Sequence, residues 1–209
     1  MNLLAIGVAG VLAAATLPLV EGLAPDLGRT RASAVIPMAV VIAGFLGWAV
    51  SQIAVVRFPS ALALGVVASV LAWQSVIDLA VHRLPRELSY LGLAVLLIAV
   101  GFSGGSDRLG GVLIGLAAMT AVTGLLVVLT RGSLGVGDLH LAPLLGALVG
   151  WFSPPLVALA WGVTALSGAV VVIIGLAAGR LRRSDHIPYG PFMILGSLVA
   201  VLVGAISVS

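Results

Sequence analysis

The chain of 209 residues contains no cysteine and no lysine. Without cysteine it has no disulfide, no thiolate-bound zinc or iron–sulfur cluster, and no cysteine nucleophile. Without lysine, mechanisms that use a Schiff base or a lysine general base are excluded as well. Charged residues make up only 8% of the sequence, whereas 61% is hydrophobic. A water-soluble domain cannot cover its surface with so few charges, so we predict an all-α polytopic membrane protein embedded in a lipid bilayer.

About eight stretches are apolar enough to form membrane helices, and proline, glycine or charge separates them. The expected helices cover residues 3–20, 35–56, 60–81, 86–102, 109–130, 139–152, 156–178 and 191–207. We expect one membrane-embedded domain over residues 1–209, with two N-terminal helices in 1–56 and a core over 60–209. Two of the helices, 86–102 and 139–152, are shorter than the others, which would let the loops before them dip below the membrane surface.

The basic residues predict the orientation of these helices. With eight spans, alternate loops share one side of the membrane, and eight of the ten arginines fall on one side. They are Arg29, Arg31, Arg83, Arg86, Arg131, Arg180, Arg182 and Arg183, against Arg57 and Arg108 on the other side. Positive charge gathers in cytoplasmic loops, so we expect the first side in the cytoplasm and both termini outside. The arginines are scattered through loops, so we expect no nucleic-acid partner.

Only two of the seven acidic residues are expected at the membrane helices. The other five, expected in solvated loops, are Glu21, Asp26, Glu87, Asp107 and Asp185. Asp78 is expected near the C-terminal end of helix 60–81, and Asp138 at the start of helix 139–152. Both ends belong to the cytoplasmic side of the predicted topology. Ionisable groups at this depth usually face a cavity or a partner.

Each aspartate also has a purely structural interpretation. Asp138 follows a glycine and precedes a helix, which is typical of an N-cap residue. Asp78 is expected near a helix C-terminus, where no free backbone N–H groups are available, but it could form an ion pair with Arg83. If the two carboxyl groups meet, they can share a proton. One can then deprotonate a water while the other protonates a peptide carbonyl, which is aspartyl-type hydrolysis.

Two other functions are compatible with these residues. A small proton-coupled transporter or channel could use the same two carboxylates, although carriers more often place such groups near the middle of the membrane. A catalytically silent scaffold is the other alternative. His82 and His140 lie close in sequence to the aspartates, and two Asp–His pairs could in principle hold a divalent metal. The HExxH pattern is absent, so we favour a site without metal or cofactor. His186 is expected in a cytoplasmic loop.

Three separated stretches resemble the type IV prepilin peptidases, which are aspartyl proteases of the GxGD type. IDLAVHRLPRELS resembles the motif of the family's first aspartate, and GVGDLHLAPLLGALVGW resembles the GxGD motif with its following helix. HIPYGPFMILGSLVA resembles the closing segment, where a proline–aromatic–glycine–proline turn leads into the last helix. The order and spacing of the three also fit, so the resemblance covers about residues 60–209.

The resemblance implies that Asp78 and Asp138 are the catalytic pair. The implied substrate is a prepilin or pseudopilin precursor with a short basic leader and a hydrophobic helix, cleaved on the cytoplasmic side of the inner membrane. Further residues are expected to shape the site or bind substrate, through turns and close approach of the substrate chain. They are Gly135, Gly137, His140, Pro188, Gly190 and Pro191.

The chain departs from the family pattern at three places. Many members carry a cytoplasmic domain with zinc-binding cysteines between the first two helices, and also N-methylate the new terminus. Here that interval is only about residues 21–34 and cysteine is absent, so we expect a peptidase without methyltransferase activity. His140 replaces a frequent lysine, which would make activity pH-dependent near neutrality. Arg86 replaces the usual asparagine or aspartate after the loop proline.

Overall fold

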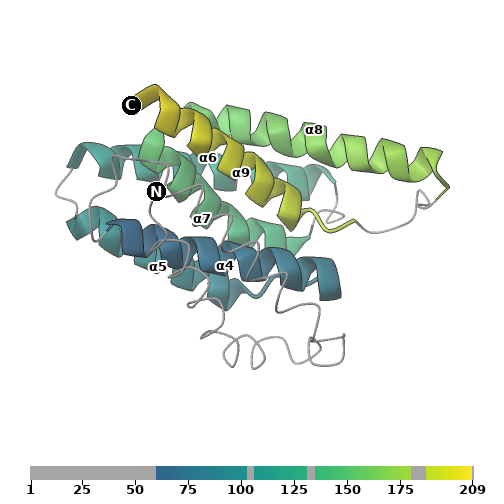
Figure 1. Ribbon diagram of the computed structural model, residues 1–209, viewed down its shortest axis with the longest axis horizontal. Helices are drawn as coiled ribbons and strands as arrows, with labels where there is room; N and C mark the ends of the chain where they lie inside the picture. The colour runs from purple at the N-terminus through teal and green to yellow at the C-terminus, as the bar shows by residue number, and fades with distance from the viewer. Residues whose placement is uncertain (1–59, 103–105, 131–134, 180–186, 209) are drawn as a thin grey trace.

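The computed structural model describes residues 60–102, 106–130, 135–179 and 187–208, and this part of the chain is helical without strands (Figure 1). The six helices in it are α4 (Ser60–Val81), α5 (Arg86–Phe102), α6 (Ser106–Leu129), α7 (Val136–Phe152), α8 (Leu156–Ala177) and α9 (Gly190–Val208). The all-α class predicted from the sequence is therefore confirmed for these residues.

The predicted helix boundaries agree closely with the observed ones. The expected helices 60–81 and 86–102 coincide with α4 and α5. Two helices begin three residues earlier than expected: α6 at Ser106 and α7 at Val136, so that the GxGD motif enters α7 itself. The predicted helices 3–20 and 35–56 lie outside the described residues, and so does His186.

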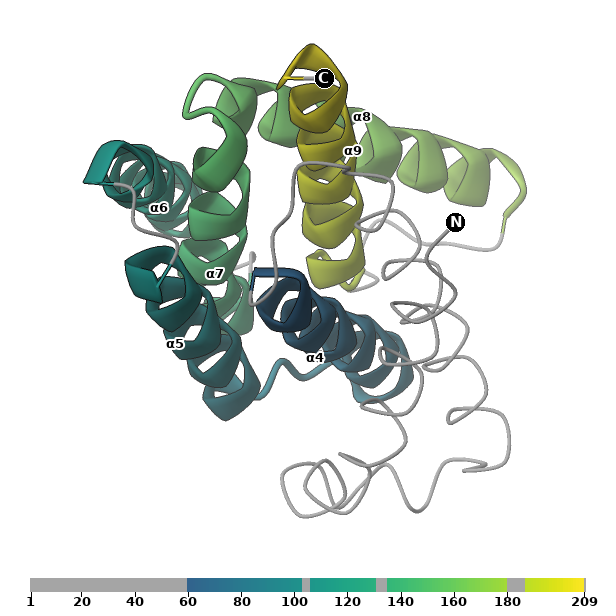
Figure 2. The ribbon, with the colours of Figure 1, turned by 60° about the vertical axis from the view of Figure 1, so that its left-hand side comes forward.

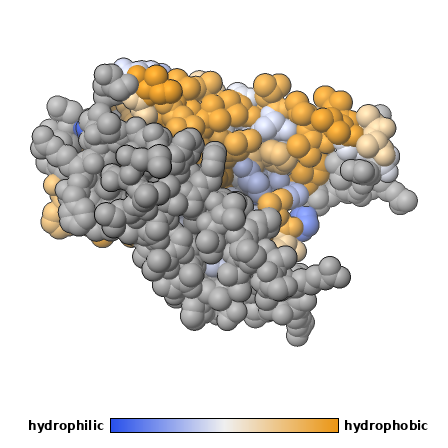
Figure 3. Space-filling view, in the orientation of Figure 1, coloured by the Kyte–Doolittle hydropathy of each residue, from blue (hydrophilic) through white to orange (hydrophobic). Residues whose placement is uncertain are grey.

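Four of the described helices are long and apolar enough to cross a membrane. Their spans are Ala63–Ala80, Arg108–Leu129, Leu156–Ala177 and Gly190–Ser207, and Val136–Phe152 is a shorter apolar helix. Figure 3 shows that hydrophobic residues cover much of the face over α8 and α9, while hydrophilic residues gather in a hollow below them. An apolar face of this kind suits contact with lipid, as expected of a polytopic membrane protein.

Helix α7 occupies the middle of the bundle (Figure 2), and more than half of its residues are buried. It packs against α5, α6, α8 and α9, whereas α4 packs against α5 and α9. Successive helices alternate in direction, so the C-terminal end of α4 and the N-terminal ends of α7 and α9 lie at the same end of the bundle (Figure 1). The two aspartates are thereby brought to one end, as the sequence predicted.

Glycines bring the backbones of α6 and α7 close together. A Cβ atom added at Gly115 would lie 2.7 Å from the Cα atom of Gly150, and one added at Gly111 would lie 2.7 Å from the carbonyl oxygen of Gly150. Gly146 faces Gly115 in the same way. The GxxxG patterns of the two helices therefore form a single close helix contact, which holds α7 against α6.

The far end of the same helix pair carries a cation–π contact. The guanidinium carbon of Arg108 lies 5.9 Å from the ring centroid of Trp151. Arg108 is near the start of α6 and Trp151 near the end of α7, so this contact lies at the opposite end of the bundle from Asp138.

We predict that Gly115→Ala destabilises the bundle, whereas Gly110→Ala does not. The new methyl group at position 115 meets backbone atoms of α7, and such overpacking costs about 1–3 kcal/mol. Gly110 lies in the same helix with nothing within 4 Å of an added Cβ atom, so its replacement should be neutral or stabilise by about 0.5–1 kcal/mol. Thermal unfolding in detergent, followed by circular dichroism, measures both. Equal midpoints for the two variants would contradict the close contact.

Candidate active site

Asp78 is a buried carboxyl group three residues before the end of α4, with only 5% of its surface exposed. Its Oδ2 atom accepts a hydrogen bond of 3.2 Å from the backbone N–H of Gly190. Gly190 is the first residue of α9, where backbone N–H groups have no partner within the helix. The expectation that Asp78 finds no free N–H group is therefore wrong, because a second helix supplies one.

The ion pair with Arg83 that the sequence left open is not what satisfies Asp78. Arg83 is exposed in the short loop after α4, whereas Asp78 points to the buried start of α9. His82 ends α4 with a positive φ of 53°, a left-handed conformation that commonly terminates a helix. Its side chain is exposed, and the charge that it can carry acts on Asp78.

Asp138 lies in the first turn of α7 and is 4% exposed. The N-cap residue is Gly135, not Asp138, so the expected N-cap role is wrong in position. The Asp138 carboxyl group instead lies close to the backbone of Gly135 at the helix start. Its Oδ1 atom is buried and has no hydrogen-bond partner among the described residues.

The carboxyl groups of Asp78 and Asp138 lie close enough for the charge on one to act on the other. They come from helices separated by about 60 residues of sequence. Both groups are almost completely buried, away from bulk water. Charges interact more strongly in such surroundings than they do in water. A pair of carboxyl groups in such surroundings is suited to sharing a proton.

The glycines of the site allow neighbouring side chains to lie directly against the backbone. Gly135 has φ −62°, which any residue can adopt, but an added Cβ atom would lie 3.3 Å from Oδ2 of Asp138. Gly137 is helical, and a Cβ atom there would lie 2.9 Å from Cβ of Leu84. At Gly190 an added Cβ atom would lie 2.8 Å from Oδ2 of Asp78. Gly137 belongs to α7, and the expected approach of a substrate chain to Gly135 and Gly137 stays a prediction.

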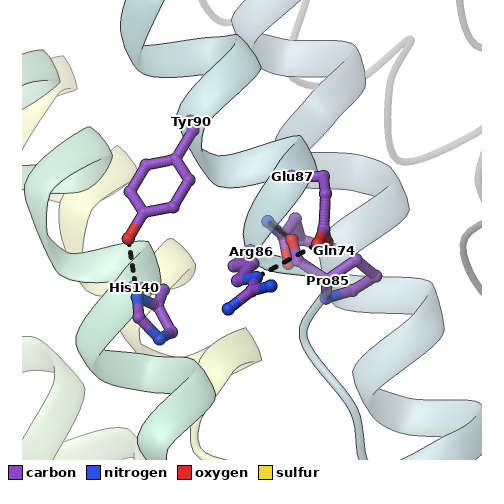
Figure 4. A network of polar contacts seen from close by, with 6 residues as sticks. All are labelled: Gln74, Pro85, Arg86, Glu87, Tyr90 and His140. Carbon is purple, nitrogen blue, oxygen red and sulfur yellow. Dashed lines mark hydrogen bonds and ion pairs between the residues drawn. The ribbon is translucent and has the colours of Figure 1, made fainter.

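His140 points toward Tyr90 of α5 (Figure 4). Its Nδ1 atom lies 2.9 Å from the hydroxyl oxygen of Tyr90. In the described part of the chain, no group of three or more histidine, aspartate or glutamate side chains is arranged to hold a metal ion.

The segment before α9 brings an aromatic side chain to the site that the sequence analysis did not select. Pro188 and Pro191 flank this turn and are partly buried. Tyr189 lies between them, and its ring centroid is 6.3 Å from that of Trp161 on α8. Burial raises the pKa of the Tyr189 phenol, and negative charge on Asp138 raises it further. The aromatic position in the proline–aromatic–glycine–proline turn was the available signal for this residue.

Known proteins match the described core. A model of the type IV leader peptidase family matches residues 65–206. Three relatives share the name prepilin leader peptidase/N-methyltransferase. The one from Stutzerimonas stutzeri is 31% identical over 137 residues, which is 62% of this chain and 45% of the relative. The one from Pseudomonas aeruginosa is 33% identical over 107 residues (49% and 35%), and the one from Burkholderia pseudomallei K96243 is 37% identical over 78 residues (36% and 24%).

The match thus spans less than half the length of each of these relatives. No solved structure matches the chain significantly. The family model nevertheless covers more than half of the sequence and includes both Asp78 and Asp138. On this ground, the chain belongs to the type IV leader peptidase family.

Proposed function

We propose that this protein is a prepilin leader peptidase that cleaves the short basic leader from type IV pilin-like precursors. The observation that carries the proposal is the meeting of Asp78 and Asp138, two buried carboxyl groups within electrostatic reach at one end of an apolar bundle. Family membership and the name shared by the relatives supply the substrate class. Within the described residues, Oδ1 of Asp138 has no hydrogen-bond partner, and Asp78 accepts one hydrogen bond, from Gly190.

The arrangement suits hydrolysis by water activation. The free Oδ1 atom of Asp138 can accept a proton from a water molecule, which then attacks the carbonyl carbon of the scissile bond. Asp78 donates a proton to the carbonyl oxygen, giving a neutral tetrahedral intermediate. Collapse of this intermediate breaks the C–N bond. The leaving amine takes the proton that Asp138 received, and Asp78 recovers its own proton from the intermediate.

We place the active site on the cytoplasmic side of the inner membrane, because the loops at this end carry most of the arginines. In this topology the protein has about eight spans, of which two lie in residues 1–59, and forms one peptidase domain. A transporter function is less compatible with the geometry. The aspartates lie in the last and first turns of their helices, whereas carriers place such groups near the membrane midplane.

We further propose that the protein does not N-methylate its product. The relatives carry both activities in their name, but the chain lacks cysteine and therefore any cysteine-bound zinc. Each relative is matched over only part of its length, and the family model matches residues 65–206, which contain both proposed catalytic aspartates. Methyl transfer, unlike peptide hydrolysis, also needs a binding site for a methyl donor.

Asp78→Asn and Asp138→Asn should each lower prepilin cleavage by about 10³-fold, because neither amide can exchange the required proton. Cleavage is measured on gels with purified protein in nanodiscs. Glu87→Gln serves as the control, since Glu87 is exposed and forms an ion pair with its neighbour Arg86. Retention of more than about a tenth of the activity in either aspartate variant would contradict the proposed chemistry. Proton-linked uptake by the wild type without cleavage would favour a transporter.

Gly190→Ala should lower kcat/KM by about 10- to 100-fold, because the new methyl group displaces the Asp78 carboxyl from its position. Gly162→Ala is a matched control. It adds the same methyl group to a glycine of α8 that has nothing within 4 Å of an added Cβ atom. If both variants cleave prepilin at the same rate, the close approach of Gly190 to Asp78 has no role in catalysis.

Mass spectrometry of the cleaved pilin tests the absence of methyl transfer. After reaction in the presence of S-adenosylmethionine, we expect a free, unmethylated N-terminus. A bifunctional relative run in parallel confirms that the assay detects the modification. A mass gain of one methyl group on the product of this protein would overturn the proposal.

A further inference from the structure

Gln74 is a fully buried polar side chain one helical turn before Asp78 on α4, with 0% of its surface exposed. Its Nε2 atom donates a hydrogen bond of 2.6 Å to the Ser89 hydroxyl and one of 3.3 Å to the carbonyl oxygen of Pro85. Ser89 is itself 1% exposed. Figure 4 shows the Gln74 amide directed at Pro85, across the gap between α4 and α5.

These two bonds fix the start of α5 relative to α4. The Pro85 oxygen can only accept, so the nitrogen of the Gln74 amide must face it. Both N–H groups of the amide are then used, one on the residue before α5 and one in its first turn. Because Gln74 and Ser89 are buried, the loss of these bonds leaves buried polar groups without partners.

Leu84, the residue before Pro85, lies between Gly137 and Gly190. A Cβ atom added at Gly137 would be 2.9 Å from Cβ of Leu84, and one added at Gly190 would be 3.0 Å from Cδ1 of Leu84. Gly137 directly precedes Asp138, and Gly190 donates the hydrogen bond to Asp78. The Leu84 side chain thus contacts the backbone beside each aspartate.

We propose that Gln74 is a positioning residue for the aspartate pair. By anchoring Pro85 and Ser89, it holds Leu84 between Gly137 and Gly190, and this spacer sets the separation of the carboxyl groups of Asp78 and Asp138. The role rests on the proposed peptidase function. Among the described residues Gln74 bonds to Pro85 and Ser89 and not to either aspartate, so we expect it to act on the rate of the chemical step rather than on the binding of substrate.

The test replaces Gln74 by leucine, which has similar volume but no hydrogen-bonding group. We expect kcat for prepilin cleavage to fall about 10- to 100-fold, since small displacements of catalytic groups have effects of this size. KM should change by less than about twofold. Ser89→Ala should lower kcat in the same direction, whereas Ser89→Thr keeps the hydroxyl and should restore the rate. Gln74→Leu with Ser89→Ala should be no slower than Gln74→Leu alone, because both remove the same contact.

Ser75→Ala is the matched control. Ser75 is a buried neighbour on the same helix, but its hydroxyl bonds only to the Leu71 carbonyl oxygen of α4, at 2.9 Å. This variant should keep the wild-type kcat. A Gln74→Leu kcat within about twofold of this control, or losses that multiply in the double variant, would show that the contact does not position the site.

Hydrogen–deuterium exchange separates this inference from the proposed function, because it needs no activity. Gln74→Leu should speed exchange in peptides covering residues 82–90, while Ser75→Ala should leave them unchanged. Unchanged exchange in Gln74→Leu would overturn the anchoring role. If the wild type cleaves no prepilin, the proposed function fails, and the exchange measurement still decides whether Gln74 anchors this segment.

Discussion

The site depends on one long-range hydrogen bond, from the backbone N–H of Gly190 to the carboxyl group of Asp78. It joins the end of α4 to the beginning of α9, across more than one hundred residues of sequence. The bond supplies an acceptor for the helix start and a donor for the carboxyl group. The first N–H groups of α9 have no acceptor within their own helix, and the buried Asp78 carboxyl requires a donor. This bond therefore orients the first aspartate and fixes the start of the last helix at the same time.

Small residues make the remaining contacts of the site possible. Glycines 135, 137 and 190 allow the chain to pass directly against Asp138, Leu84 and Asp78. On the other side of α7, the glycines shared with α6 hold the helix that carries Asp138 in a fixed place. In a bilayer, apolar side chains gain little free energy when they move from lipid into protein contacts. Close packing and buried hydrogen bonds must therefore hold the helices together. Around the site the glycine backbone meets side chains directly, whereas between α6 and α7 backbone meets backbone.

Local sequence patterns predicted the helices and the two aspartates well. The ends of α4 and α5 were predicted to the residue, because charge, proline and glycine mark them. Because alternate loops share one side of the membrane, the sequence also predicted that Asp78 and Asp138 lie at the same end of the bundle. The sequence could not show which distant groups meet. These contacts are the Gly190 N–H with Asp78, Leu84 with Gly137 and Gly190, and Gln74 with Pro85. The N-cap expected of Asp138 failed for a related reason, since GVGD enters the helix and Gly135 takes the cap position.

The contact of Arg108 with Trp151 has a consequence for the membrane itself. Arginine and tryptophan both favour the membrane–water interface, so this pair marks the boundary at the far end of α7. Asp138 lies thirteen residues back along the helix, a rise of about 20 Å. The hydrocarbon layer of a bilayer is about 30 Å thick. A bilayer that thins beside α7, or water that reaches below its surface, would make up this difference and bring Asp138 into contact with water.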